Sequence, residues 1–182
     1  MTSRTLVLGI GNILLHDDGV GVWVAESLSR RFRFPESVTI IEGGTLGLDL
    51  LPQLDGVARL LIVDAVRHGR APGELVRLEG REVPAVLGQK ISPHQVGVQD
   101  LLAGAHLMGL EFSNLVLWGI EPESLEPGTG FSSTVADALP SLMTNVIEEL
   151  ARWGLAGRPC SEDLSSPIWW VEPNSERRPS RY

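Results

Sequence analysis

The sequence predicts a single α/β domain, with about five mainly parallel strands and helices on both faces of the sheet. Four continuous apolar runs are typical of strands buried on both faces, as in a parallel sheet. Segments with the apolar spacing of helices separate these runs. The chain has 182 residues, of which 43% are hydrophobic, which suits one domain with a substantial core and is too short for two.

The predicted strands occupy residues 5–10, 38–41, 60–63 and 115–120, and we expect the strand that ends at Asp64 to be central. A polar-apolar pattern at 73–78 predicts an edge or antiparallel strand. Helical patterning covers residues 19–32, 99–108 and 134–155, and weakly 46–54. In the longest of these segments, Pro140 is compatible with a helix only near the first turns or at a kink.

The chain divides into a domain at 1–156 and a C-terminal tail at 157–182 that is rich in Pro, Ser and Arg. The tail contains one apolar segment, formed by Ile168, Trp169, Trp170 and Val171. Because adjacent aromatic side chains favour burial, this segment is either a clamp that folds back on the domain or a docking peptide.

Composition restricts the partners and the compartment. The net charge of −8 argues against nucleic acid as a main partner, because phosphate binding needs concentrated Lys and Arg. No apolar run approaches membrane-spanning length, and the N-terminus enters the first strand without a signal peptide. Cys160 is the only cysteine, which excludes an internal disulfide. We therefore expect a cytoplasmic protein without nucleic-acid or membrane partners.

The junction between the first strand and the first helix is the most informative segment. A glycine turn after Gly9 and Gly11 leads to Asp17 and Asp18 at the start of the helix. Such turns usually bind phosphate, but two carboxylates repel a pyrophosphate and offer oxygen ligands to a cation. Leu14 also stands where a dinucleotide motif has its third glycine.

Further polar residues follow the other predicted strands, and in open α/β sheets ligands bind outside the carboxyl ends of strands. These residues are Glu42, Gly43, Gly44 and Thr45 after the second strand, Asp64 after the third, and His94 in a Ser-Pro-His loop. Each has an ordinary alternative: a helix N-cap for Asp17 or Asp18, a turn cap for Asp64 and a structural role for His94. Together, two carboxylates and an imidazole would give a divalent metal three ligands and leave positions open.

At these residues the sequence resembles the hydrogenase maturation endopeptidases, cytosolic proteases that trim the C-terminal extension from the large subunit of nickel-iron hydrogenases. The matching motifs occur in order over about two thirds of the chain. They are Gly9-x-Gly11-Asn12-x-Leu14-x-x-Asp17-Asp18-Gly19-x-Gly21, Gly43-Gly44-Thr45, Asp64-Ala65, Ser92-Pro93-His94-Gln95 and Gly119-Ile120-x-Pro122-x-Ser124.

The resemblance implies that Asp18, Asp64 and His94 contact the metal and carry catalysis, with nickel supplied by the hydrogenase precursor. Glu42 departs from the pattern, because relatives commonly carry Asp before Gly-Gly-Thr, and we assign it no catalytic role. We expect Asp17 to turn toward the N-terminus of the helix. The alternatives are a nucleotide- or flavin-binding module of doubly wound type and a nickel-sensing assembly chaperone that does not cleave.

Overall fold

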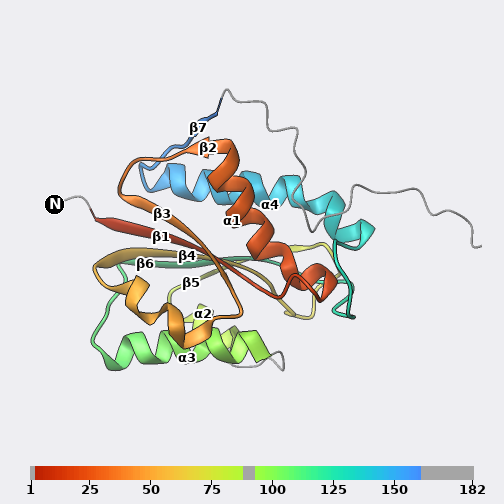
Figure 1. Cartoon of the computed structure of the whole chain (residues 1–182), viewed down its shortest axis with the longest axis horizontal. Helices are drawn as coiled ribbons and strands as arrows, with labels where there is room; N and C mark the ends of the chain where they lie inside the picture. Colours follow the sequence, from red (N-terminus) through yellow and green to blue (C-terminus); the bar gives the residue numbers. More distant parts are fainter. Residues whose placement is uncertain (1–2, 88–92, 161–182) are drawn as a thin grey trace, which may run out of the picture.

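A five-stranded sheet forms the centre of the molecule (Figure 1). The computed structural model describes residues 3–87 and 93–160, except for the side chains of residues 86 and 93–96. The strand order is β3-β1-β4-β6-β5. The strands are β1 (Arg4–Ile10), β3 (Val38–Gly44), β4 (Val57–Ala65), β5 (Leu75–Glu79) and β6 (Asn114–Ile120).

Four of these strands are parallel, and β5 pairs antiparallel with β6 at one edge. The mainly parallel sheet, the central position of β4 and the antiparallel edge strand are as predicted. Leu60, Leu61, Ile62 and Val63 of β4 are fully buried, because a central strand is covered on both faces and places alternate side chains in opposite directions.

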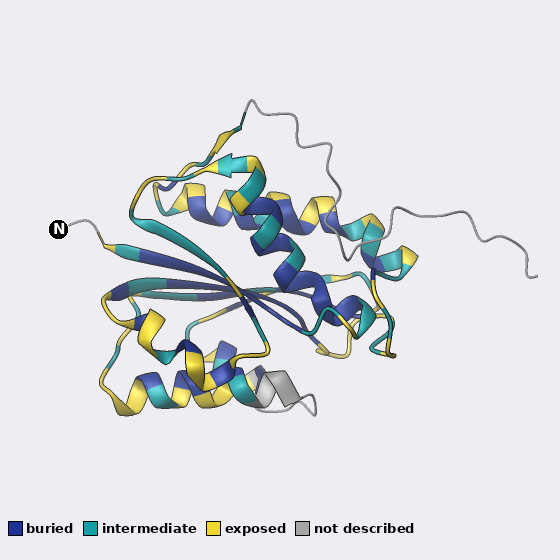
Figure 2. Cartoon of the chain, in the orientation of Figure 1, coloured by how far each residue is buried: buried dark blue, intermediate teal, exposed yellow. Residues whose placement is uncertain are grey.

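Helices cover both faces of the sheet and create two cores (Figures 1 and 2). The short 3-10 helix η1 (His16–Gly19) leads into α1 (Val20–Arg31), which shares one face with α4 (Ser133–Arg152). The other face carries the 3-10 helix η2 (Gly47–Leu54), α2 (Glu82–Leu87) and α3 (Pro93–Leu107). Val20, Val24 and Leu28 of α1 all belong to the core under α1 and α4, as their spacing predicted.

Several elements differ from the prediction. The helix predicted at 99–108 begins at Pro93, since proline suits the first turn of a helix, so His94 lies in a helix and not in a loop. The segment at 46–54 is a 3-10 helix that contains Pro52. Helix α2 and a two-stranded sheet, β2 (Phe32–Arg33) with β7 (Arg158–Pro159), were not predicted. Helix α4 continues through Pro140, the eighth of its 20 residues.

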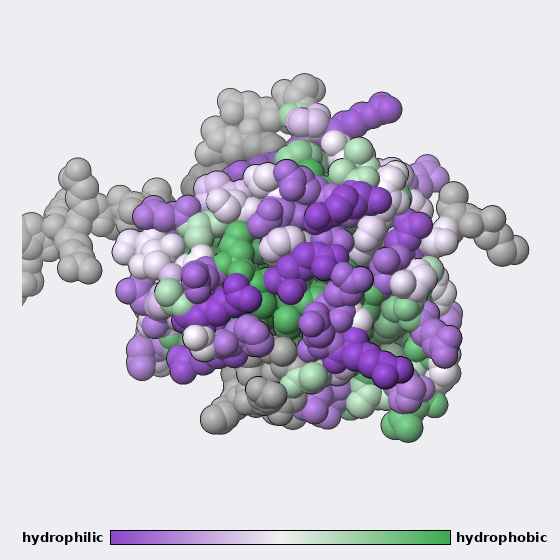
Figure 3. All heavy atoms as spheres, turned by 180° about the vertical axis from the view of Figure 1, so that it is seen from behind, coloured by the Kyte–Doolittle hydropathy of each residue, from purple (hydrophilic) through white to green (hydrophobic). Residues whose placement is uncertain are grey.

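On the face in Figure 3, hydrophilic side chains surround a small apolar area near the middle. In residues 3–87 and 93–160, no helix is long and apolar enough to cross a membrane.

Candidate functional site

A tight turn after β1 places Asp18 at the carboxyl edge of the sheet. Gly11 has a φ of 133°, and a Cβ atom there would lie 1.7 Å from the carbonyl oxygen of Asp18, so only glycine fits. The backbone N–H of Asn12 donates to Oδ2 of Asp18 at 3.0 Å. Asp18 is 1% exposed, and the turn therefore holds its carboxylate inside the protein in a defined orientation.

Asp64 lies at the same edge. It is the penultimate residue of β4, is fully buried, and pairs with Gly119 of β6. The first turn of α1 contacts the backbone beside it: a Cβ atom on Gly21 would lie 2.1 Å from the carbonyl oxygen of Val63 and 2.3 Å from that of Ile10. Because Asp18 precedes Gly21 by three residues and Asp64 follows Val63, the close packing of α1 on β1 and β4 brings the two aspartates to the carboxyl ends of these neighbouring inner strands. We call this place the aspartate corner.

Asp17 has a different role. Its Oδ2 accepts hydrogen bonds from the backbone of Glu123 at 2.9 Å and Ser124 at 2.8 Å, and from Oγ of Ser132 at 2.9 Å. Its Oδ1 accepts from the backbone of Ser132 at 2.7 Å. Ser132 is the N-cap of α4, so Asp17 faces the N-terminus of α4. The expectation that Asp17 faces its own helix was wrong: α1 has Gly19 as its N-cap and no side-chain cap, while the carboxylate of Asp17 bonds to the start of α4.

The glycines after β3 join the same edge. The backbone N–H of Gly11 donates to the carbonyl of Gly44 at 3.1 Å, which ties the turn after β1 to the turn after β3. Glu42, opposite Gly9 in the register, is exposed. Desolvation by the surrounding protein and, to a smaller extent, the charge of Glu26 raise the pKa of Glu42.

His94 lies in the first turn of α3, and its side chain lies outside the described residues. The backbone just after this turn is close to the segment after β3, since a Cβ atom on Gly47 would lie 2.9 Å from Cα of Gly97. Among the side chains that the structure describes, no three His, Cys, Asp or Glu residues are grouped to hold a metal ion. The ligand set of Asp18, Asp64 and His94 therefore stays a prediction, with both aspartates at one corner and α3 beginning near the same edge.

The loop between β6 and α4 is a part of this region that sequence reasoning missed. His16 has a φ of 45°, and its ring lies against Gly128, where a Cβ atom would be 2.2 Å from Nε2. The backbone N–H of His16 donates to the carbonyl of Gly128 at 3.0 Å. Glu121, 7% exposed, accepts from the backbone of His68 at 2.7 Å and Arg70 at 3.1 Å. The motif at 119–124 was a signal for this loop, but its partner Asp17 was not predictable from spacing.

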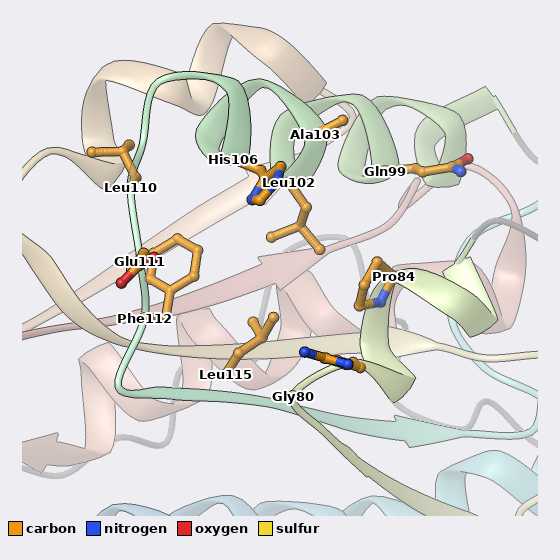
Figure 4. A pocket seen from close by; sticks show the side chains of 11 residues that line it. Gly80, Pro84, Gln99, Leu102, Ala103, His106, Leu110, Glu111, Phe112 and Leu115 are labelled. Atoms are coloured by element: carbon orange, nitrogen blue, oxygen red, sulfur yellow. The ribbon is translucent and has the colours of Figure 1, made fainter.

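A separate cavity of about 720 Å³ lies between α2, α3 and β6 (Figure 4). Its labelled lining residues include Pro84, Leu102, Phe112 and Leu115. Leu115 pairs with Leu60, four residues before Asp64 in β4, which corresponds to about 13 Å along a strand. The cavity is therefore displaced along the sheet from the corner that holds the aspartates.

Comparisons with known proteins agree with this arrangement. A family model described as hydrogenase maturation protease matches residues 22–149. The Hydrogenase 2 maturation protease of Escherichia coli K12 is 41% identical over 157 residues, which cover 86% of this chain and 96% of that protein. The hydrogenase expression/formation protein HupD of Rhodobacter capsulatus is 39% identical over 98% of this chain and 87% of its own length, so the similarity extends into residues 161–182.

Solved structures show the same relationship. The hydrogenase maturating endopeptidase HybD from E. coli has a TM-score of 0.83 at 40% identity, covering 88% of this chain and 99% of its own. The [NiFe] hydrogenase maturation protease HybD from Thermococcus kodakarensis has a TM-score of 0.65 at 27% identity, covering 81% and 99% of the two chains. These matches argue against a nucleotide- or flavin-binding module. The chain belongs to the hydrogenase maturation protease family and is a hydrolase.

Proposed function

We propose that this endopeptidase removes the C-terminal extension of a nickel-iron hydrogenase large-subunit precursor in the cytoplasm, after nickel has been inserted. The observation that carries the proposal is the placement of Asp18 and Asp64, both buried, at the carboxyl ends of β1 and β4 in a chain of this family. A buried carboxylate is costly unless hydrogen-bond donors or a cation offset its charge. Nickel that arrives with the precursor would supply such a cation.

The residues present fit nickel that is already bound by the precursor. Carboxylate and imidazole ligands without a thiolate hold free nickel weakly, whereas thiolates from a precursor would add strong ligands. Asp18, Asp64 and His94 would complete the coordination and leave the remaining positions to the substrate. Nickel would supply some Lewis acidity to the scissile carbonyl, and Asp18, Asp64 and His94 would mainly position the bond.

Contacts within the chain hold Asp18 and Asp64 in place for the positioning of the scissile bond. The Asn12 N–H fixes one oxygen of Asp18, and the packing of Gly21 on the Val63 carbonyl fixes the distance between α1 and β4. Asp17 holds the turn against the loop that follows β6. The corner is therefore organised before substrate binds, which lowers the entropic cost of orienting the peptide bond.

Apolar side chains near this corner suit a protein substrate. Leu14, which follows β1, is 61% exposed, and Leu46 and Leu48, which follow β3, are 54% and 51% exposed. Exposed leucines near a site are typical of surfaces that bind another protein. Replacing Leu46 and Leu48 with Ser is expected to raise KM for the precursor about thirtyfold with little change in kcat, because each leucine contributes on the order of 1 kcal/mol of binding.

The decisive experiment incubates the protein with nickel-loaded and nickel-free precursor, and measures the mass of the products. We expect cleavage only of the loaded precursor, and none with Asp18→Asn, Asp64→Asn or His94→Ala. Asp49→Asn, an exposed aspartate in η2, is the matched control and retains activity. Cleavage of metal-free precursor in a chelator would overturn the dependence on nickel. A stable complex without mass loss would instead favour an assembly chaperone.

A further inference from the structure

A groove of about 490 Å³ lies between α1 and α4, in the layer that covers one face of the sheet. Its walls are apolar and come from Trp23 and Phe32 on one side and Met143 and Ile147 on the other. Trp23, Phe32 and Ile147 are only partly buried, although all three pack against the core under α1 and α4. Apolar walls that are only partly covered in this way suit an apolar occupant.

The chain itself leads into this groove. After α4 it returns along the end of α1, where β7 pairs with β2 and the Cys160 N–H donates to the Arg31 carbonyl at 2.8 Å. Pro159 and Cys160 line the groove. The sequence continues for 22 residues beyond Cys160, and its concentrated apolar segment begins at Ile168.

We propose that Ile168, Trp169, Trp170 and Val171 bind in the groove between α1 and α4 of the same chain. The seven residues 161–167 bridge about 23 Å when extended, at roughly 3.3 Å per residue. The groove wall on α4 runs from Pro140 to Ile147, which is about 10 Å of helix at 1.5 Å per residue. The connection is therefore long enough for the aromatic pair to reach any part of the groove.

The charges of residues 162–163 and of the arginines at the end of α1 also favour a path of the tail toward the groove. Glu162 and Asp163 begin the connecting segment. Arg31, Arg33 and Arg158 are exposed around the end of α1, and Arg31 lies over the Trp23 ring at 5.9 Å. Opposite charges at the start of the segment would direct it along the basic end of α1 and toward the aromatic wall.

The segment would act as a clamp across two helices that both connect to the site. Helix α1 follows Asp18, and the N-cap of α4 is held by Asp17. Binding across α1 and α4 would fix the position of the two helices relative to each other along the groove, from Trp23 near the start of α1 to Arg31 at its end. This proposal does not depend on the cleavage reaction, and it is tested on the free protein.

The first test is a disulfide trap in full-length protein that carries Cys160→Ser. We expect Thr144→Cys in the groove and Val171→Cys to form an intrachain disulfide within minutes in mild oxidant. The control pair is Ala103→Cys with Val171→Cys, because Ala103 is an exposed helical residue beside the cavity on the other face of the sheet. A disulfide only between two chains, equal trapping by the control, or no trapping at all would overturn the proposal.

The second test measures thermal unfolding. Trp169→Ala/Trp170→Ala is expected to lower Tm by about 5 °C, whereas Tyr182→Ala, the removal of the other aromatic residue in the tail, leaves Tm unchanged. Ile147→Ala should lower Tm less in the double-Trp variant than in the wild type, because its contact would already be lost. Additive effects of these substitutions, or an unchanged Tm for the double-Trp variant, would contradict docking in this groove.

Discussion

Helix α4 is held by a buried carboxylate at each of its ends, and the two carboxylates are satisfied in different ways. At the N-terminus, Asp17 accepts three backbone N–H groups and one hydroxyl. Near the C-terminus, Glu149 accepts from the side chains of Arg77, Arg152 and Trp118. The first arrangement joins α4 to the turn that carries Asp18, and the second joins α4 to the edge of the sheet at β5 and β6.

The different donors at the two ends of α4 predict different consequences when either carboxylate is removed. The backbone N–H groups that bond to Asp17 have fixed positions in the loop after β6 and at the start of α4. Asp17 therefore holds this loop, the start of α4 and the neighbouring residue Asp18 in place together. The side chains around Glu149 are longer and partly exposed, since Arg77 is 33% and Arg152 is 56% exposed. We therefore expect a break at the Asp17 end to affect both folding and processing, and a break at the Glu149 end to affect folding alone.

The largest effect is expected for Asp17→Ala. This change leaves three partly buried N–H groups without the carboxylate that accepts from them, and we expect a loss of about 3 kcal/mol in the free energy of unfolding. Processing of nickel-loaded precursor should fall more than the folded fraction does, because the turn that carries Asp18 is then held by the Asn12 N–H bond and no longer by the loop after β6. Urea unfolding and cleavage rates per folded molecule measure the two effects. Full cleavage by the folded fraction would show that Asp17 does not position the site.

Glu149→Gln is expected to have the second largest effect. Glu149 is 2% exposed, and its carboxylate forms a bidentate contact with Arg77 at 2.9 and 3.0 Å. The substitution keeps the size of the side chain but removes the negative charge that Arg77 and Arg152 share, so that Arg77 keeps only its exposed partner Glu79. We expect a cost of about 2–3 kcal/mol after allowance for the partial exposure of Arg77. Cleavage by the folded protein should equal that of the wild type. A selective loss of activity would contradict the division between the two ends.

The sequence predicted the sheet well because burial on both faces leaves a direct signature, as in Leu60, Leu61, Ile62 and Val63. It failed where a short element depends on distant partners, as for β2, which forms only because β7 returns beside it. The motif also placed Asp17 and Asp18 side by side without distinguishing them. Their separate roles arise from the loop at 121–132, more than 100 positions away in the chain, which no local pattern reveals.

The pH dependence of the free energy of unfolding tests the contribution of Glu149 more sharply. Hydrogen bonds from Arg77 hold the pKa of Glu149 below its usual value, and burial only partly opposes this shift. A lowered folded-state pKa means that the contribution to stability is fully present above the unfolded value near 4.5 and is lost as pH falls through the folded value. The stability difference between wild type and Glu149→Gln should therefore be constant from pH 7 to about pH 5 and should shrink below pH 4. Urea titrations at pH 7, 5 and 3.5 would detect this, and a constant difference at all three would contradict it.

The smallest effect is expected for Ser132→Ala, which weakens the Asp17 end without removing it. The hydroxyl donates to Asp17 at 2.9 Å and accepts from the Val135 N–H at 3.3 Å, so its loss removes the cap of α4 and one of the four bonds to Asp17. The backbone N–H of Ser132 still reaches Oδ1 at 2.7 Å. We expect a loss of about 1 kcal/mol, as for other N-caps, and cleavage reduced no more than twofold. The control is Ser133→Ala, an exposed neighbour in the first turn. If Ser132→Ala impaired cleavage as strongly as Asp17→Ala, the hydroxyl and not the backbone donors would hold the site, and the comparison between the two ends of α4 would need to be revised.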